Sequence, residues 1–390
     1  MLTAVFEVAI NHSAKDRSSC AIGIMSGTSV DGIDAVLIEI SPTDAEQNRV
    51  QVRDHCFAAF EPSLADSIQE LMTPGDNEID RAGEVGIQLA HAYASIANRL
   101  IERNDNIAID VIGCHGQTVR HRPDSDFPFT VQLGCGATIA AHTQHPVVCD
   151  FRAADIAHGG QGAPFAPFLH AELLGGKTEN RVILNLGGIA NVTLLPAAQS
   201  HNVLGFDTGP ANVLMDLWHQ SHHSSERFDR DGAWASSGTI DKDLLGKMLG
   251  DPYFARPAPK STGREYFNAK WLDAFTEDIN GLDAADVQAT LAELTSLSVT
   301  RAVQNAMPDV SRVIVCGGGA NNAHLLARMS SNLNVPIQGS DQFGVDPHHV
   351  EAMTFAYLAW RTLQRQASTM PSVTGADRST VAGAIYFPAD

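Results

Sequence analysis

Two segments of the chain share one layout, in which an apolar run, a glycine turn and a second apolar run follow each other. The first is AIGIMSGTSVDGIDAVLIEI at residues 21–40, and the second is RVILNLGGIANVTLL at residues 181–195. Branched apolar residues on both sides of a turn are typical of a β-hairpin. The similarity is one of pattern, not of residue identity. It predicts an α/β protein with two related halves, each directing a hairpin at a shared cleft.

The runs between and after these hairpins predict the other elements. Periodic apolar residues indicate helices, and short apolar runs bounded by turn residues indicate strands. A strand should end at Asp207 and a helix should begin near Pro210, while residues 219–266 should form a polar excursion over the surface. The other expected elements are strands near 50–60, 111–114, 130–133 and 147–151, helices at 82–102, 288–306 and 349–365, and a strand–turn–helix unit at 312–329.

Length and charge limit the class of protein. A chain of 390 residues exceeds what one core usually serves, so two domains are expected. Hydrophobic residues make up 44% and charged residues 18%, which indicates a globular protein. The formal net charge of −19 repels nucleic acid phosphates, so we expect no nucleic-acid partner. A small anionic substrate stays possible in a locally positive pocket.

The cysteines and the first residues favour a reduced, cytoplasmic protein without a membrane segment. Six cysteines are scattered without a CxxC pair, which argues against structural zinc and a disulfide framework. The opening MLTAVFEVAI lacks a basic start and is too short for a signal peptide or membrane span. Residues 1–20 are therefore interpreted as an N-terminal extension of unknown role.

Three glycine turns follow apolar strands: Ser26-Gly27-Thr28-Ser29, Leu186-Gly187-Gly188 and Cys316-Gly317-Gly318-Gly319. Glycine lets a backbone approach a phosphate closely, and bare N–H groups can point at the anion. None of the turns matches GxxxxGK[ST] or GxGxxG, so the P-loop and Rossmann motifs are excluded. Each turn alone is more often only a tight connection, but three together favour a nucleotide gripped from several sides.

Three carboxylates near these turns have two interpretations each. Asp31 and Asp34 could orient a hydrated Mg²⁺, whereas Asp31-Gly32 could be a hairpin turn signal only. Asp207 lies where a strand becomes a helix and could point into the cleft of a layered α/β protein. From spacing alone, a helix N-cap is the more common role for such an aspartate.

A polar cluster occupies the glycine-rich segment 150–167. Its side chains could bind sugar hydroxyls, and Arg152 could hold a carboxylate with two parallel hydrogen bonds. An ordinary surface loop is an equally good interpretation. The members of this cluster are Asp150, Arg152, Asp155, His158 and Gln161.

Sixteen histidines raise the question of a metal site. The closest groups, at 219–223 and 348–349, match neither HExxH nor a zinc-ligand spacing with cysteine. We therefore expect no transition-metal site. His115 directly follows a predicted strand and is interpreted as a hydrogen-bond partner of a substrate. Glu351, near the start of a predicted helix, is uninformative by itself.

Taken together, the segments resemble the anhydro-N-acetylmuramic acid kinases, from Ala21 to nearly the end of the chain. One departure is Ala211, where the family's DTGPGN motif would have glycine; we expect this extra methyl group to be tolerated. The matching motifs are IGIMSGTSVDGID, GCHGQTVRH, TVQLG, DFRAADIAHGGQGAPFAP, LNLGGIANVT, GFDTGPANVLMD, VCGGGANN, VEAMTFAYLA and PSVTGA.

The resemblance implies the actin-like ATPase fold, with two duplicated ribonuclease H-like domains flanking an ATP cleft. It implies a first domain of residues 21–150 plus about 367–390 and a second domain of residues 151–366. It also implies a homodimer in the bacterial cytoplasm. ATP and Mg²⁺ would be the cofactors, and a small sugar would be the substrate.

Site residues follow from the same resemblance. Asp207 and Glu351 would be catalytic, and Asp31 would hold Mg²⁺ directly or through water. His115, Gln117, Arg152, Asp155 and Gln161 would bind the sugar. The residues expected to bind ATP are Gly27, Thr28, Ser29, Val30, Asp31, Gly32, Ile33, Asp34, Gly187, Gly188, Gly317, Gly318, Gly319 and Asn321.

The implied activity opens 1,6-anhydro-N-acetylmuramic acid with water and phosphorylates its O6, in the recycling of peptidoglycan. The products would be N-acetylmuramic acid 6-phosphate and ADP. Two alternatives stay open: another kinase of this fold that phosphorylates a free hydroxyl, and a nucleotide-gated binding protein in the manner of Hsp70.

Overall fold

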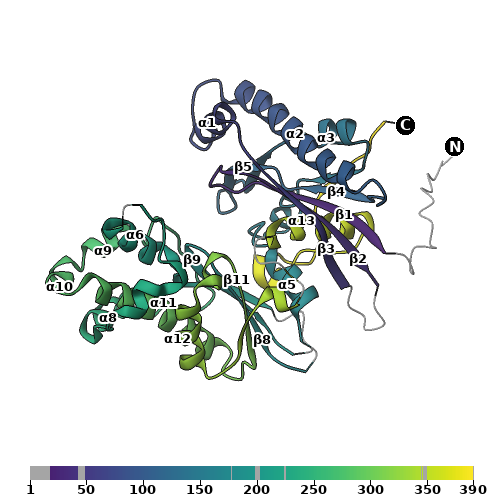
Figure 1. Ribbon diagram of the computed structural model, residues 1–390. Coiled ribbons are helices and arrows are strands. Elements are labelled where there is room, and N and C mark those ends of the chain that lie inside the picture. The colour runs from purple at the N-terminus through teal and green to yellow at the C-terminus, as the bar shows by residue number, and fades with distance from the viewer. Residues whose placement is uncertain are drawn as a thin grey trace.

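The computed structural model describes residues 18–42, 49–176, 178–197, 203–223, 225–343, 345 and 349–389. The chain forms two α/β lobes, each built around its own mixed sheet (Figure 1). Most of the expected extension at residues 1–20 lies outside the described residues. Within the described residues, no helix combines the length and apolar character needed to span a lipid bilayer.

The first sheet has the strand order β13-β7-β4-β1-β2-β3. β1, β2 and β3 form an antiparallel meander, and β4 and β7 continue the sheet parallel to β1. The hairpin predicted at residues 21–40 is therefore confirmed. The strand bounds are β1 Ser19–Met25, β2 Gly32–Ser41, β3 Arg49–Ala59, β4 Val111–Cys114, β7 Val147–Cys149 and β13 Ala384–Tyr386.

The second sheet repeats this order. Its strands run β10-β9-β8-β11-β12, with an antiparallel meander followed by two parallel strands. Strand for strand, this is the arrangement β3-β2-β1-β4-β7 of the first sheet. The predicted duplication is thus confirmed by topology, as expected for an actin-like fold. The strand bounds are β8 Arg181–Leu186, β9 Ile189–Leu195, β10 Leu204–Pro210, β11 Arg312–Cys316 and β12 Ile337–Gly339.

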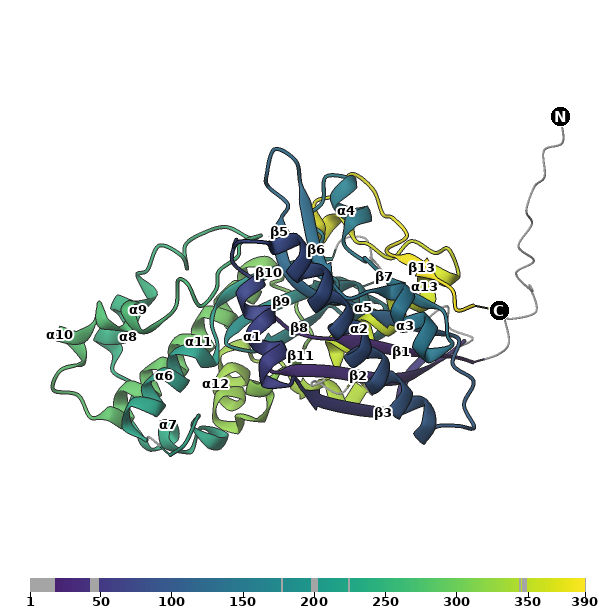
Figure 2. The ribbon, with the colours of Figure 1, turned by 90° about the horizontal axis from the view of Figure 1, so that it is seen from above.

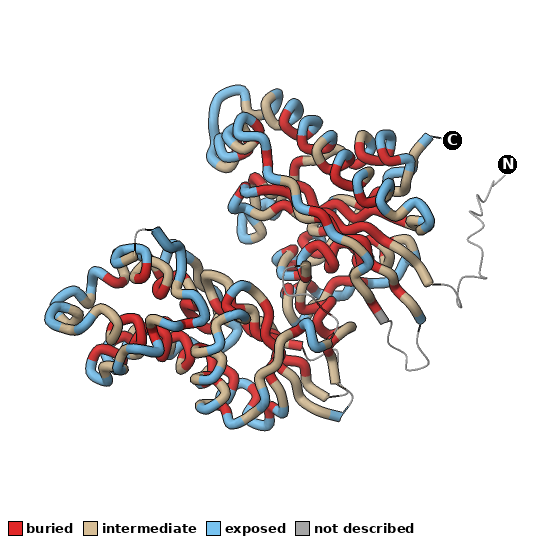
Figure 3. The backbone as a smooth tube through the Cα atoms, viewed as in Figure 1, coloured by how far each residue is buried: buried red, intermediate tan, exposed pale blue. Residues whose placement is uncertain are grey.

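Helices cover both sheets, and the tube in Figure 3 shows the buried residues concentrated along the strands and the facing helix sides. On the first sheet, α2 (Glu78–Arg103) lies over β2 and β3, and α3 (Gly136–Thr143) contacts β7. On the second sheet, α11 (Ala284–Ala306) contacts β10 and the neighbouring α6 (Asn212–His222) and α12 (Ala323–Leu333). A separate hairpin of β5 (Gln117–Arg122) and β6 (Phe129–Leu133) stands beside the first sheet (Figure 2).

Two helices join the lobes through one apolar core. α13 (Val350–Leu363) packs on β1 and β4, and α5 (Ala166–Leu174) contacts α13 as well as β8 and β9. The buried cluster around them includes Ala21 of β1, Ile183 of β8 and Ile314 of β11. Although α13 lies within the range expected for the second domain, its packing partner is the first sheet.

Most predicted elements are confirmed, and two predictions were wrong. Strand β10 continues past Asp207 to Pro210, so Asp207 does not end the strand. The segment 219–266 is not only a surface excursion, because α8 (Lys242–Leu249) places Leu244 and Met248 in the core of the second lobe. The remaining elements are α1 Pro62–Leu71, α4 Ala153–Ala157, α7 Ala233–Ser237, α9 Ala269–Asp273, α10 Thr276–Ile279, α14 Pro371–Thr374 and the 3₁₀ turns Arg230–Gly232, Gly318–Asn321 and Ser340–Phe343.

We predict that Gly23→Ala destabilises the protein. A Cβ atom at Gly23 would lie 1.9 Å from the Ala352 carbonyl oxygen of α13, so the helix and the sheet would have to separate. Overpacking of this kind costs about 1–3 kcal/mol, and more where only backbone can move. The measurement is the urea midpoint of unfolding.

Gly83→Ala is the matched control, because Gly83 is exposed on α2 with no atom near the added methyl group. That substitution should stabilise the helix by about 1 kcal/mol. If Gly23→Ala unfolded at the same urea concentration as the unsubstituted protein, the close packing of α13 would be contradicted.

Candidate functional site

The first glycine turn connects β1 to β2 and is fixed from below. Ser26 Oγ hydrogen-bonds Tyr93 Oη at 2.7 Å, and Gln117 Nε2 donates to the Gly27 carbonyl oxygen at 3.1 Å. Both anchoring side chains, Tyr93 and Gln117, are fully buried. Thr28 and Ser29 are exposed at the tip. The turn therefore presents hydroxyl groups on a rigid base.

Val30 closes this turn in an unusual backbone conformation. Its φ is 54°, in the left-handed region, and its side chain is buried. A β-branched residue is strained there, and such strain persists where the surroundings over-determine it. The Val30 N–H also donates to the Gly27 carbonyl oxygen at 3.2 Å. The turn therefore keeps one shape.

Arg152 and His115 form the centre of a polar cluster on the first lobe. His115 follows β4, and Arg152 precedes α4. Arg152 donates from Nε and Nη2 to His115 Nε2 at 3.0 and 2.8 Å, and from Nη1 to the Gly162 carbonyl oxygen at 2.6 Å. His115 Nε2 must then be the unprotonated nitrogen. Two of the five guanidinium hydrogens are left for a ligand.

The electrostatics of this cluster keep His115 neutral and Arg152 charged. Burial, reinforced by the Arg152 charge, lowers the pKa of His115 to about 3. Burial lowers the pKa of Arg152 to about 10, and the nearby Glu351 carboxylate opposes this. Glu351, in the first turn of α13, reaches solvent, but the protein around it desolvates the carboxylate. Desolvation, together with Asp34, raises the pKa of Glu351, and Arg152 opposes the rise.

Asp155 and Gln161 come from the same segment but have different surroundings. Asp155 is fully buried, and its two oxygens accept from the Gly162 N–H at 2.8 Å and from Thr374 Oγ1 at 2.7 Å. It therefore holds the loop after α4 against α14. Gln161 is exposed and donates from Nε2 to Asp124 Oδ1 at 2.9 Å.

Asp207 lies on the second lobe, inside β10 and next to a β-bulge between Asp207 and Gly209. The helix that follows has Ala211 at its N-cap, so Asp207 is not the helix cap that spacing favoured. Its carboxylate accepts from the Thr262 N–H at 3.0 Å. The backbone is gripped as well, because its N–H donates to the Lys260 carbonyl oxygen at 2.9 Å and its carbonyl accepts from Tyr253 Oη at 2.8 Å.

The pKa of Asp207 is raised by its position. Burial of the carboxylate is the main cause, Glu265 adds to the rise, and the Thr262 N–H opposes it. A carboxylate with a raised pKa is a stronger base than an exposed aspartate, and such shifts are frequent at reacting sites.

The second glycine turn is fastened to the start of α6. The Gly188 carbonyl oxygen accepts from the Ala211 N–H at 2.9 Å, and Asn212 Nδ2 donates to the Gly187 carbonyl oxygen at 2.8 Å. A Cβ atom at Gly188 would lie 3.0 Å from Arg264 Nε. The Arg264 guanidinium therefore lies closely against the bare backbone of this turn.

A cavity of about 640 Å³ opens beside the third glycine turn. Gly318, Gly319 and Asn321 line it, as expected for residues near a nucleotide, whereas Gly317 is absent from its lining. Gly317 has a φ of 79° and lies against Asn185 and Leu186, so it shapes the turn rather than the cavity wall.

Sequence reasoning missed several residues of this cavity. Asp216 is part-buried in its wall, and burial raises its pKa to about 6, with Asp229 adding to the rise and Arg264 opposing it. Gln288 is fully buried, and its Oε1 has no hydrogen-bond partner among the described residues. A free acceptor and a row of carboxylates suit the amino and hydroxyl groups of a nucleoside.

The segment Lys260–Arg264 was also missed, although its composition contains a signal. It combines two hydroxyl groups, a glycine and two cations in the sequence KSTGR. It follows no strand, whereas the three glycine turns recognised in the sequence all follow predicted strands. In the fold, this segment contacts Asp207 and Gly188, each of which is more than 50 positions away from it along the chain.

The expected site residues thus gather in two groups. His115, Arg152, Asp34 and Glu351 interact on the first lobe, while Asp207 and the second and third glycine turns belong to the second lobe. Across the described residues, no hydrogen bond or ion pair connects Asp207 to Arg152 or Glu351.

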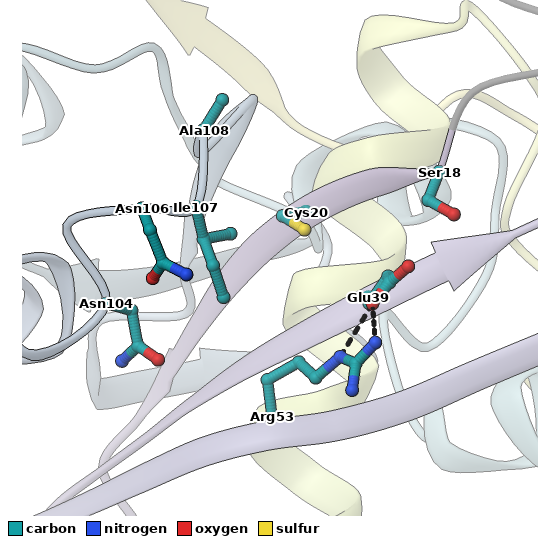
Figure 4. Close-up of a pocket in the computed structure, with 8 residues that line it drawn as sticks. All are labelled: Ser18, Cys20, Glu39, Arg53, Asn104, Asn106, Ile107 and Ala108. Carbon is teal, nitrogen blue, oxygen red and sulfur yellow. Dashed lines mark hydrogen bonds and ion pairs between the residues drawn. The ribbon is translucent and has the colours of Figure 1, made fainter.

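Two further features bear on ligands. No cluster of three or more His, Cys, Asp or Glu side chains suited to a metal occurs in the described ranges. A separate hollow of about 520 Å³ lies over β1, β2 and β3 of the first sheet, where Glu39 and Arg53 form an ion pair (Figure 4). None of the expected site residues lines that hollow.

Comparison with known proteins identifies one family over nearly the whole chain. The family model described as Anhydro-N-acetylmuramic acid kinase matches residues 19–388. An anhydro-N-acetylmuramic acid kinase of Xylella fastidiosa is 45% identical over 384 residues, covering 96% of this chain and 98% of that protein. The one of Saccharophagus degradans is 45% identical over 379 residues, covering 95% and 100%.

Several solved structures show a distant resemblance to the chain. One is the activator of 2-hydroxyisocaproyl-CoA dehydratase from Clostridium difficile, with 12% sequence identity and a TM-score of 0.40, covering 88% of this chain and 96% of that one. The fold assignment accordingly rests on the repeated sheet order described above.

We predict that Arg152→Ala raises the pKa of His115. Removing the guanidinium removes one of the two causes of the lowered value, while burial keeps the pKa below the ordinary 6.5. The measurement is an NMR pH titration of labelled histidines. His170 is the internal control, since its pKa is lowered to about 4 by burial alone. An unchanged His115 titration would contradict the contact with Arg152.

Proposed function

The chain belongs to the anhydro-N-acetylmuramic acid kinase family, and we propose that it opens 1,6-anhydro-N-acetylmuramic acid and phosphorylates O6 with ATP. The products are N-acetylmuramic acid 6-phosphate and ADP, in the recycling of the bacterial cell wall. The observation that carries the proposal is the match of this one family over residues 19–388.

The reaction needs one carboxylate base. Asp207 takes a proton from a water molecule as the water oxygen bonds to C1. The C1–O6 bond breaks, O6 takes the γ-phosphoryl group, and ADP leaves with the electrons of the broken phosphoanhydride bond. An inverting glycosidase needs a second carboxyl group to protonate its leaving oxygen. Here the phosphoryl group captures that oxygen. No second carboxyl group is therefore needed, and Asp207 alone can act as the base.

The sugar is bound by the cluster on the first lobe. Arg152 keeps two donors for the carboxylate of the substrate's lactyl group, and its contacts with His115 and Gly162 hold the guanidinium plane in place. Glu351 accepts a hydrogen bond from the sugar on the opposite side. Gln117 and Asp155 act by positioning the first glycine turn and the loop after α4, and Gln161 contacts the sugar from that loop.

ATP lies with its adenosine in the cavity beside Gly318, Gly319 and Asn321 and its phosphates along the other two glycine turns. The first turn, from Gly27 to Asp34, offers hydroxyl and carboxylate oxygens, which are the ligands that Mg²⁺ prefers. Asp31 is exposed and accepts from Ser29 Oγ at 2.9 Å, so it would hold the ion through water. Mg²⁺ would neutralise charge on the phosphates.

The proposal includes a cytoplasmic location, where the sugar from wall turnover would be met, and a homodimer, which the family resemblance alone implies. The domain division proposed from the sequence assigns residues 21–150 and about 367–390 to one domain and residues 151–366 to the other, although α13 of the second range packs on the first sheet. The cleft between them is where sugar and ATP meet.

Asp207→Asn should fold and bind ATP but lose turnover by about 10²–10⁴-fold, the usual value of a positioned base. The change keeps the size of the side chain and removes only its basicity. Turnover is measured as sugar phosphate by mass spectrometry, and folding by the melting temperature. Near-normal turnover would remove Asp207 from the mechanism.

The reaction in ¹⁸O-water should place the label at C1 of the product. Attack of water on C1, not on phosphorus, is the distinctive step of the proposal. Label found in inorganic phosphate would instead indicate ATP hydrolysis, as expected for a nucleotide-gated binding protein. A sugar phosphate without label would indicate a kinase that uses a free hydroxyl group.

A further inference from the structure

Arg264 occupies a place that the family resemblance did not assign. Its guanidinium lies against the second glycine turn, where a Cβ atom at Gly188 would be 3.0 Å from Nε and 3.1 Å from Nη2. The Arg264 residue is exposed. The chain thus places the cation of a long, exposed side chain over the bare backbone of the second glycine turn.

The backbone on both sides of Arg264 is fixed. Upstream, Lys260 and Thr262 hydrogen-bond the backbone and the carboxylate of Asp207. Downstream, the Phe267 N–H donates to the Gly263 carbonyl oxygen at 3.1 Å, and the Phe267 ring is fully buried. The Arg264 backbone is therefore positioned by the catalytic strand and by the core of the second lobe.

The positive charge of Arg264 is available to an anionic ligand. The Arg264 charge lowers the pKa of Asp216, which lies in the wall of the 640 Å³ cavity. Glu265 is the next residue along the chain, and its charge raises the pKa of Asp207. Among the described residues, no carboxylate lies within ion-pair distance of the guanidinium. A polyphosphate led past Asp216, Glu265 and Asp207 without a cation would be repelled by all three.

We infer that Arg264 binds the γ-phosphate of ATP. Arg264 acts electrostatically on Asp216 in the wall of the cavity that would hold the adenosine, and two residues upstream Thr262 contacts the Asp207 carboxylate. A phosphate chain that runs from that cavity to Asp207 would pass the guanidinium. A guanidinium can form two parallel hydrogen bonds to a phosphate, which a lysine cannot. The inference rests on the proposed function for the identity of the nucleotide.

Gly188 has a part in this arrangement. A Cβ atom there would press against the guanidinium at 3.0 Å and shift it slightly, so Gly188→Ala should weaken the same phosphate contact without removing a charge. This gives a second, chemically different way to disturb the contact.

The test compares Arg264→Ala, Arg264→Lys and Gly188→Ala with the unsubstituted protein. Arg264→Ala should lower turnover by about 10²–10³-fold, the usual loss for one preorganised donor at a developing charge. It should weaken the binding of a non-hydrolysable ATP analogue at least tenfold more than that of ADP, measured by calorimetry. Arg264→Lys should lie between, and millimolar guanidinium chloride should restore part of the turnover of Arg264→Ala only.

Arg301→Ala is the matched control. Arg301 is also an exposed arginine of the second lobe, on α11, but it lines a different cavity together with Phe206 and Thr208. It should keep both turnover and the preference for the ATP analogue. Melting temperatures of all variants separate a lost contact from a lost fold.

Equal weakening for ADP and the ATP analogue, or unchanged turnover in Arg264→Ala, would overturn the inference. Failure of the unsubstituted protein to phosphorylate the anhydro-sugar would instead overturn the proposed function. In that case the comparison of ADP with the ATP analogue still decides whether Arg264 binds the γ-phosphate.

Discussion

The contact of α13 with two glycines of the first sheet determines where Glu351, His115 and Arg152 lie. A Cβ atom at Gly23 or Gly113 would be within 2.1 Å of a carbonyl oxygen of α13, so helix and sheet meet backbone to backbone. This contact brings Glu351 and Phe355, from near the end of the chain, to the loops after β1 and β4. The His115 ring then packs 4.5 Å from the Phe355 ring, which fixes its partner Arg152.

Asp207 and Glu351 belong to different lobes, and desolvation raises the pKa of each, with different charged neighbours. Glu351 is desolvated beside Asp34 and partly balanced by Arg152. Asp207 is desolvated by the segment that contains Tyr253, Lys260 and Thr262. That segment follows α8 and holds Asp207 through the Tyr253 hydroxyl and through the backbone of Lys260 and Thr262. Chemistry that needs both carboxylates therefore requires both lobes.

The sequence predicted what depends on local pattern. Glycine turns between apolar runs marked both hairpins, and apolar periodicity marked α2 and α11, because these signals come from neighbouring residues. The prediction that Asp207 ends its strand and caps the next helix was wrong. A β-bulge lets β10 continue to Pro210, and the N-cap is Ala211. Arg264, Asp216 and Gln288 were missed, because only tertiary packing brings them to the glycine turns.

The family resemblance supplied site residues that no pattern could rank, and the structure gives them unequal surroundings. Asp155 has both oxygens committed to Gly162 and Thr374, whereas Arg152 retains free donors. Such a difference between a supporting and a contacting side chain is a matter of hydrogen-bond satisfaction, which is not readable from spacing.

The strained Val30 has a consequence for affinity. A flexible loop must lose conformational entropy when it closes on a ligand, and that loss is subtracted from the binding free energy. The turn after β1 is already held in one shape by buried partners and by a left-handed valine. The entropy of ordering this turn is lost when the chain folds, so it is not subtracted again from the free energy of binding a ligand there.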